Sequence, residues 1–219
     1  MHIPDGFIPL DQAVIYWIIA LVFIALALRW ARKELSEEKV PIVAVLAAAI
    51  FAMQAFNLPV GMGTSGHLVG GALAAIILGS PFAAVFILTI VLIIQGVIFG
   101  DGGITTMGAN IINMGVIGGF VGFYGFVGLK SLIKNPYVSA GIAAWFACFI
   151  PALAASVELW IAGTFPLVPG MIAMGTYHAA IGIIEAFITA IAVYLVWRAR
   201  PDLDWTSAPA PTTPGGAVA

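Results

Sequence analysis

The chain has 219 residues, of which 62% are hydrophobic and only 8% charged, and its mean hydropathy is +1.12. Soluble domains average roughly 45–50% apolar and about 25% charged residues. The composition therefore excludes a soluble globular protein and indicates an integral membrane protein. A net charge of −2 gives no reason to expect a nucleic-acid partner, and a single cysteine, Cys148, excludes a disulfide framework.

Seven apolar segments are candidates for crossing the bilayer, which takes about 20 helical residues. They fall near residues 10–30, 40–57, 67–79, 82–99, 108–130, 137–162 and 169–198. The third segment is short, and joining it to the fourth would leave six spans. We expect an all-α bundle that forms a single transmembrane domain over residues 1–200.

The positions of the basic residues decide between six and seven spans. All eight Lys and Arg residues lie at positions 29, 32, 33, 39, 130, 134, 198 and 200. Seven spans with the N-terminus outside put all of them on the cytoplasmic side, whereas six would divide them between the two faces. We therefore expect seven spans in the plasma membrane and a cytoplasmic C-terminus. Residues 201–219 are rich in Pro, Thr, Gly and Ala, which predicts a disordered cytoplasmic tail.

The first two residues provide three nitrogens that can bind one metal ion. The Met1 amine, the His2 amide and the His2 imidazole can close on one metal ion as fused chelate rings. His67 follows a glycine-rich stretch at 61–66 that lets another backbone approach closely, so it can supply a fourth nitrogen. Ni²⁺ and Cu²⁺ accept an in-plane set of four nitrogens, with Co²⁺ close behind. The alternatives are an unordered polar end for His2 and a hydrogen bond to a loop carbonyl for His67.

Further polar residues lie in or beside the predicted spans. His178 and Glu185 are seven residues apart on one face of the last span, and Asn110 and Asn113 share a face near the start of the fifth. Polar groups at this depth are expected to face the bundle interior. Asp101, which is flanked by glycines, forms either an ordinary turn or a loop that is fixed over the site.

Several segments, in their order and spacing, resemble the CbiM/NikM family. These proteins are the substrate-binding (S) membrane subunits of energy-coupling-factor (ECF) cobalt and nickel transporters. The segments are MHIPDGF at 1–7, GTSGHLVGG at 63–71, GDGGI at 100–104, GANIINMG at 108–115, and the stretch from His178 through Gly182 and Glu185 to Thr189. The resemblance covers roughly residues 1–200.

The resemblance implies a seven-helix bundle whose N-terminal segment folds inward from the outer face. It implies a metal held by the Met1 amine, the His2 amide and imidazole, and His67. The residues implied to support the site are Asp5, Asp101, Asn110, Asn113, His178 and Glu185. The transported ion would be Ni²⁺ or Co²⁺, with no catalytic cofactor, and the GTSGHL sequence at 63–68 resembles the nickel-type members.

The sequence contains no phosphate-binding GxxxxGK(S/T) loop, so the chain has no ATP site of its own. By resemblance, the energy for uptake comes from a transmembrane coupling (T) subunit and two ATPase subunits of an ABC importer. The resemblance also allows a small accessory membrane subunit. We expect a transporter subunit rather than an enzyme.

Two other functions remain open at this point. A self-sufficient secondary carrier would need ionisable residues or broken helices at mid-membrane in two related halves. An intramembrane metalloenzyme would need an open metal position for water, and four nitrogens occupy the plane. Ala44, Ala48 and Ala52 form a small-residue ridge that either packs within this chain or docks on the coupling subunit. Glu158, near the outer end of the sixth span, is expected to reach water.

Overall fold

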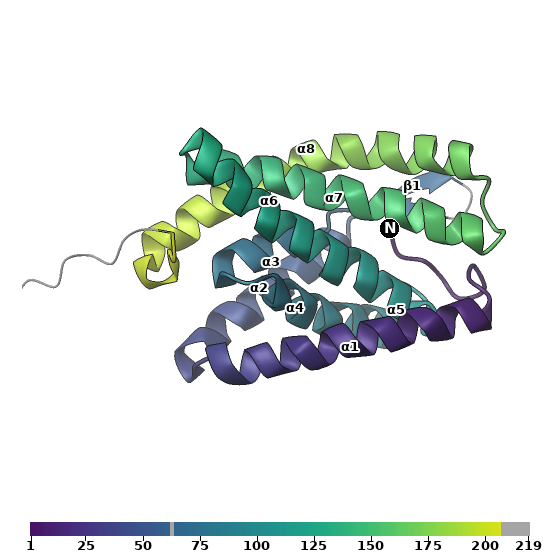
Figure 1. The fold of residues 1–219 in the computed structure, drawn as a ribbon, viewed down its shortest axis with the longest axis horizontal. Coiled ribbons are helices and arrows are strands. Elements are labelled where there is room, and N and C mark those ends of the chain that lie inside the picture. The colour runs from purple at the N-terminus through teal and green to yellow at the C-terminus, as the bar shows by residue number, and fades with distance from the viewer. Residues whose placement is uncertain (62–63, 207–219) are drawn as a thin grey trace, which may run out of the picture.

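The structure is a computed structural model that describes residues 1–61 and 64–206, and these residues form a helical bundle with one short β-hairpin (Figure 1). The α-helices are α1 (Leu10–Glu34), α2 (Val40–Gln54), α3 (Gly71–Leu78), α4 (Pro81–Ile94), α5 (Met107–Asn110), α6 (Gly118–Ile133), α7 (Pro136–Ile161) and α8 (Leu167–Ala199). The hairpin strands are β1 (Leu58–Gly61) and β2 (Thr64–Gly66), which pair antiparallel. The remaining elements are the 3-10 helices η1 (Glu37–Lys39) and η4 (Pro201–Leu203) and the π-helices η2 (Gln95–Phe99) and η3 (Ile111–Ile117).

Two π-helical segments extend the α-helices beside them. Because η2 continues α4 and η3 joins α5 to α6, the described part of the chain contains five helical stretches that are long and apolar enough to cross a membrane. They are Leu10–Glu34, Pro81–Phe99, Met107–Ile133, Pro136–Ile161 and Leu167–Ala199. These stretches correspond to five of the seven predicted spans.

The other two predicted spans, 40–57 and 67–79, are shorter in the structure. Helix α2 has 15 residues, and α3 has only eight, which is about 12 Å at 1.5 Å per residue. The left-handed glycines Gly70 and Gly79 bound α3 at its two ends, with φ values of 78° and 70°. Although α3 is too short to cross the bilayer alone, all its residues from Gly71 to Ile77 are buried. It is therefore an interior helix of the bundle.

Glycines bring the neighbouring helices into backbone contact with α3. A Cβ atom added to Gly122 of α6 would lie 2.6 Å from the Cα of Ala72 in α3. Real Cβ atoms do not approach other atoms this closely, so α6 lies against α3 only because position 122 has no side chain. The interior helix is thus held by close packing rather than by its own length.

The alanine ridge of α2 faces away from the rest of the described chain. Ala44, Ala48 and Ala52 are all exposed, whereas Leu46 and Ile50 of the same helix are buried. Packing of the ridge within this chain, one of the two interpretations given above, is therefore wrong for the described residues.

The beginning of the predicted disordered tail is ordered. Residues 201–206 include η4, the buried side chain of Leu203, and Trp205, whose Nε1 donates to the Ile76 carbonyl at 2.8 Å. The indole also stacks on Phe123, with ring centroids 5.6 Å apart. The side chains of Leu203 and Trp205 pack against the end of the bundle. Composition alone does not predict this packing. The rest of the predicted tail, 207–219, lies outside the described residues.

Substitution of Gly122 by alanine is expected to lower the melting temperature of the protein in detergent. The added methyl group must displace the α3 backbone, and overpacking of this kind costs about 1–3 kcal/mol. Gly128→Ala is the control on the same helix, because no atom lies within 4 Å of its added methyl group. Alanine there is expected to leave the melting temperature unchanged or to raise it. Equal melting temperatures for the two variants would contradict the close contact of α3 with α6.

Candidate metal site

The N-terminal segment turns back into the bundle, so that the chain terminus lies among the helices (Figure 1). Met1, His2 and Ile3 are only 1%, 4% and 1% exposed. An unordered polar end, the alternative given above for His2, is therefore wrong. A buried chain end is costly unless its polar groups find partners.

The main chain of Ile3 has such partners in the loop before α5 and in α5 itself. Its N–H donates to Asn110 Oδ1 at 2.8 Å. Its carbonyl oxygen accepts from the Gly103 N–H at 3.0 Å, from Thr106 Oγ1 at 2.5 Å and from Asn110 Nδ2 at 3.1 Å. Asn110 thus holds both polar groups of one residue, as a strand neighbour would. Asn110 therefore holds the N-terminal segment in place, and its supporting role in a metal site stays a prediction.

Asp5 fixes the segment where it leaves the bundle. Its carboxylate accepts from the Thr105 hydroxyl at 2.6 Å and from the Thr105 and Ile104 amides at 2.8 and 3.1 Å. These hydrogen bonds, the Thr105 hydroxyl foremost, lower the pKa of Asp5. A lowered pKa in the folded state means that the stabilisation is present at neutral pH and is lost as the pH falls through that pKa. A side chain at Gly103 would collide with Asp5, which explains the glycine there.

The two imidazoles expected to bind metal lie face to face. The rings of His2 and His67 stack with centroids 4.4 Å apart and an interplanar angle of 23°. His67 Nδ1 lies 2.8 Å from the Leu68 carbonyl oxygen, so Nδ1 carries the proton and the lone pair of Nε2 is free. Nε2 is buried without a hydrogen-bond partner, and so are both ring nitrogens of His2. Buried nitrogens without partners are the exception in proteins and need an explanation.

The Met1 amine provides a second kind of nitrogen. It donates to the main-chain oxygen of Ser65 and lies 3.3 Å from the Ser65 hydroxyl, two residues before His67. Burial lowers the pKa of this amine to about 4, so the amine is neutral at physiological pH. A neutral amine has a lone pair available for a metal ion. The arrangement can therefore offer amine and imidazole nitrogens from one small region.

Side chains alone do not form a metal site in the described residues. No group of three or more His, Cys, Asp or Glu side chains is placed to hold an ion there. The candidate ligand set depends on main-chain nitrogen at the chain terminus together with two imidazoles. Such nitrogen donors suit Ni²⁺, Cu²⁺ or Co²⁺ better than Mg²⁺, which prefers oxygen.

His178 and Glu185 of α8 lie behind the segment that carries His67. The Glu185 carboxylate accepts from the Val69 and Gly70 amides at 2.7 and 2.8 Å, just before α3 begins. His178 lies against Gly66, where an added Cβ would be 3.5 Å from its Cε1. Its Nδ1 is 2.8 Å from the Met174 carbonyl oxygen, and its Nε2 is buried without a partner. Glu185 thus fixes the chain just after His67, and His178 packs against it just before His67.

Asn113 does not join the group around the N-terminal segment. Its Nδ2 donates to Glu158 Oε2 of α7 at 2.7 Å. Glu158 is buried, so the expectation that it reaches water is wrong. Asn110 ends α5, whereas Asn113 lies in the π-helical η3, and the wider turn moves it off the face it would share with Asn110 in an α-helix.

Sequence reasoning also missed Ser65 and Thr106, which bond the Met1 amine and the Ile3 carbonyl. Both are hydroxyl residues inside the glycine-rich segments quoted above or directly after them. Their nearness to those glycines was the available indication. Hydroxyl groups are common in turns, however, and spacing does not reveal which of them bond across the fold.

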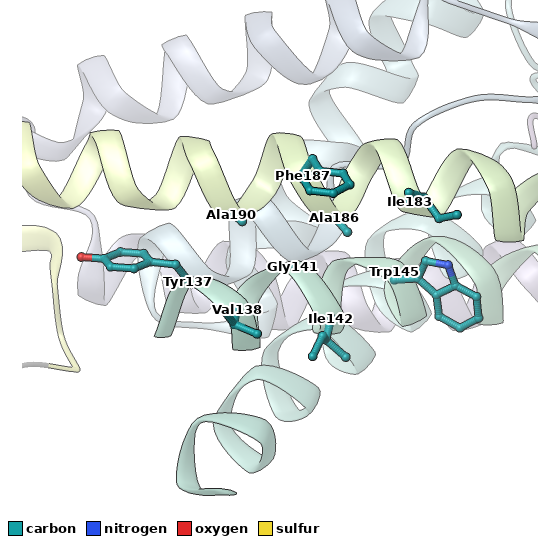
Figure 2. Close-up of a pocket in the computed structure, with 9 residues that line it drawn as sticks. All are labelled: Tyr137, Val138, Gly141, Ile142, Trp145, Ile183, Ala186, Phe187 and Ala190. Atoms are coloured by element: carbon teal, nitrogen blue, oxygen red, sulfur yellow. The ribbon is translucent and has the colours of Figure 1, made fainter. Parts of the chain in front are cut away.

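A larger hollow in the structure lies away from these residues. It is a groove of about 420 Å³ between α7 and α8, with Tyr137, Trp145 and Phe187 around a floor that includes Gly141 and Ala186 (Figure 2). Its lining is apolar and aromatic and includes none of the candidate ligands. The groove therefore offers nothing to bind a metal ion.

Substitution of Asn110 by alanine is expected to release the N-terminal segment. The change removes both hydrogen bonds to Ile3. The Ile3 carbonyl keeps Gly103 and Thr106 as donors, but the buried amide loses its partner, which costs about 1–3 kcal/mol. Hydrogen–deuterium exchange at the Ile3 amide should accelerate strongly. Asn113→Ala is the matched control, since it removes the bond to Glu158 and leaves the bonds to Ile3 intact. Equal exchange in the two variants would contradict the role of Asn110.

Three comparisons with known proteins each cover most of the chain. A family model described as the cobalt uptake substrate-specific transmembrane region matches residues 2–203. The chain is 38% identical over 205 residues to a putative fused nickel transport protein NikMN of Archaeoglobus fulgidus, which covers 93% of this chain and 68% of that protein. It is 40% identical over 210 residues to a putative metal transport protein of Haloquadratum walsbyi, which covers 94% of both. A crystal structure of a truncated transition metal transporter matches with a TM-score of 0.85 and 33% identity, over 91% of this chain and 99% of the other. The chain therefore belongs to the CbiM family of transmembrane proteins.

Proposed function

We propose that the protein binds Ni²⁺ tightly and takes it up as the substrate-binding subunit of an ECF-type ABC importer, with Co²⁺ as the second candidate. The observation that carries the proposal is the burial of the chain terminus with the His2 ring stacked on His67. The names of the relatives, which are nickel and metal transport proteins, support a metal as the transported substrate.

The ligand set of the proposal has four nitrogens. The Met1 amine, the His2 amide and His2 Nδ1 would form two fused chelate rings, and His67 Nε2 would supply the fourth position. The free lone pair of His67 Nε2 and the neutral Met1 amine fit this assignment, because each can bind a metal without first losing a proton. A deprotonated amide in the plane favours Ni²⁺ over Zn²⁺, which prefers a tetrahedron.

The proposal includes seven membrane-embedded helices with the N-terminus outside. Helices α2 and α3 would be the two that are too short to count as spans by length. The α1–α2 turn, the α6–α7 turn and the end of α8 lie at one end of the molecule, opposite the α7–α8 turn (Figure 1). All eight Lys and Arg residues lie in these three segments or within the last two turns of the helices that lead into them, which supports a cytoplasmic location for that end.

The partners in the proposal are a T subunit, two ATPase subunits and, in some assemblies, a small accessory membrane subunit. The exposed alanine ridge of α2 supports docking of a transmembrane helix there, because small side chains let helix backbones approach closely.

Ala48→Leu is expected to reduce recovery of the assembled complex from detergent at least several-fold, because the larger side chain holds a docked helix away. Ala25→Leu, the same change at an exposed alanine of α1, is the control and should leave recovery unchanged. Wild-type recovery for Ala48→Leu would remove the ridge as the docking surface.

The secondary carrier and the metalloenzyme remain alternatives that one experiment separates from the proposal. Rapid Ni²⁺ flux into liposomes that contain only this chain would favour a self-sufficient carrier. Binding without flux is expected, because the proposed chain relies on ATPase partners for inward release.

His2→Ala and His67→Ala are each expected to abolish tight Ni²⁺ binding in titration calorimetry. The loss should exceed the roughly 10–100-fold that follows when only a group supporting a ligand is removed. One extra residue before Met1 should have the same effect, because it converts the amine into an amide. The same residue added after Ala219 is the control. Unchanged affinity in the chain with the extended N-terminus would refute the site, and a parallel titration with Co²⁺ tests the preference for nickel.

A further inference from the structure

We propose that Asp101 is the capture ligand of this site, the carboxylate that first binds the arriving hydrated divalent cation and passes it to His2. The proposal rests on the proposed function, because it assigns a path into the same nitrogen site. It gives Asp101 a direct contact with the ion, which goes beyond the loop-fixing role expected from the sequence.

Asp101 is placed between water and the buried ring of His2. Its Oδ1 lies 3.3 Å from His2 Nδ1, and the two side chains are 30% and 3% exposed. The His2 nitrogen nevertheless has no hydrogen-bond partner, so the two groups face each other without a well-formed bond. One side of the carboxylate thus meets solvent while the other meets a proposed metal ligand.

The loop holds the carboxylate in this position. Asn57 Nδ2, just before β1, donates to Oδ2 at 3.3 Å, and the Asp101 amide donates to the Gln95 carbonyl at 3.0 Å. Gly102 has a φ of 92°, and an added Cβ would lie 3.3 Å from His2 Cδ2. The loop therefore lies directly over the His2 ring, and a larger residue at position 102 would be strained and crowded.

The other two carboxylates near the site are occupied by protein donors. Asp5 accepts from Ile104 and Thr105, and Glu185 accepts from Val69 and Gly70. Asp101 Oδ1 instead faces the proposed ligand His2. Of these three carboxylates, Asp101 is the one placed to exchange with a water molecule of an arriving ion.

Distance and charge both fit a shared ion. Two ligands at right angles on one metal, each about 2.0–2.1 Å away, are roughly 2.9 Å apart. The separation of 3.3 Å between Asp101 Oδ1 and His2 Nδ1 needs only a small movement to reach this value. The four nitrogens provide one negative charge, from the deprotonated amide, against two positive charges on the ion. The carboxylate supplies the second negative charge, which a buried cation needs.

The test separates association from dissociation by stopped-flow mixing of Ni²⁺ with the purified full-length chain in detergent. Binding is followed through the ultraviolet absorption that appears when an amide nitrogen coordinates nickel. Asp101→Asn is expected to slow association by about 10-fold or more and to remove most of its dependence on salt, because a steering charge is lost. Asp101→Glu, which keeps the charge, should restore association to within about 3-fold of the wild type.

Asp11→Asn is the matched control, because it removes an exposed carboxylate from the first turn of α1. It should leave association unchanged. Wild-type association rate and salt dependence in Asp101→Asn, even with faster dissociation, would overturn the proposal and leave Asp101 as a loop-fixing residue. Asp101→Ser is a second neutral variant with the same two outcomes, should Asp101→Asn fold poorly. Absence of Ni²⁺ binding by the wild-type chain in calorimetry would instead refute the proposed function itself.

Discussion

The candidate site depends on one constraint: the polar groups of the buried N-terminal segment need hydrogen-bond partners. A terminus that enters a helical bundle brings an amine and several peptide groups away from water, and each of these costs free energy unless it finds a partner. The loop before α5 meets this need for Ile3 through Gly103, Thr106 and Asn110. Asp5 then closes the same loop from outside. With the peptide groups of Ile3 satisfied, His2 is presented with both ring nitrogens unpartnered.

His67 is held in place by a separate set of contacts, from a different helix. Glu185 of α8 binds the two amides that precede α3, and α3 itself is locked between helices by glycine contacts. The two stacked imidazoles therefore belong to segments that are anchored on different helices. The relative position of the two rings therefore depends on both anchors, the hydrogen bonds to Ile3 and those of Glu185.

Much of the fold followed from composition and from the lengths of the apolar segments. Five of the expected spans appear as long apolar helices, because about 20 consecutive apolar residues are a strong and local property of the sequence. The bounds of the short interior helix α3 could not be predicted from hydropathy, because hydropathy does not show that left-handed glycines end the helix on both sides. The ordered segment at 201–206 did not follow either, because its order comes from the pairing of Trp205 with distant aromatic rings.

The sequence by itself determined that the protein is a membrane protein, because long apolar runs are a local property of the chain. It also predicted chelation of a metal by the first two residues, because their nitrogens are close together in the covalent structure. Only the tertiary structure decided that His67 stacks on His2, that Asn110 rather than Asn113 holds the N-terminal segment, and that Asp101 faces the His2 ring. These contacts join residues about 45 to 110 positions apart. Spacing along the chain limits which residues can share a face, but helix packing and a π-helical turn determine which of them meet.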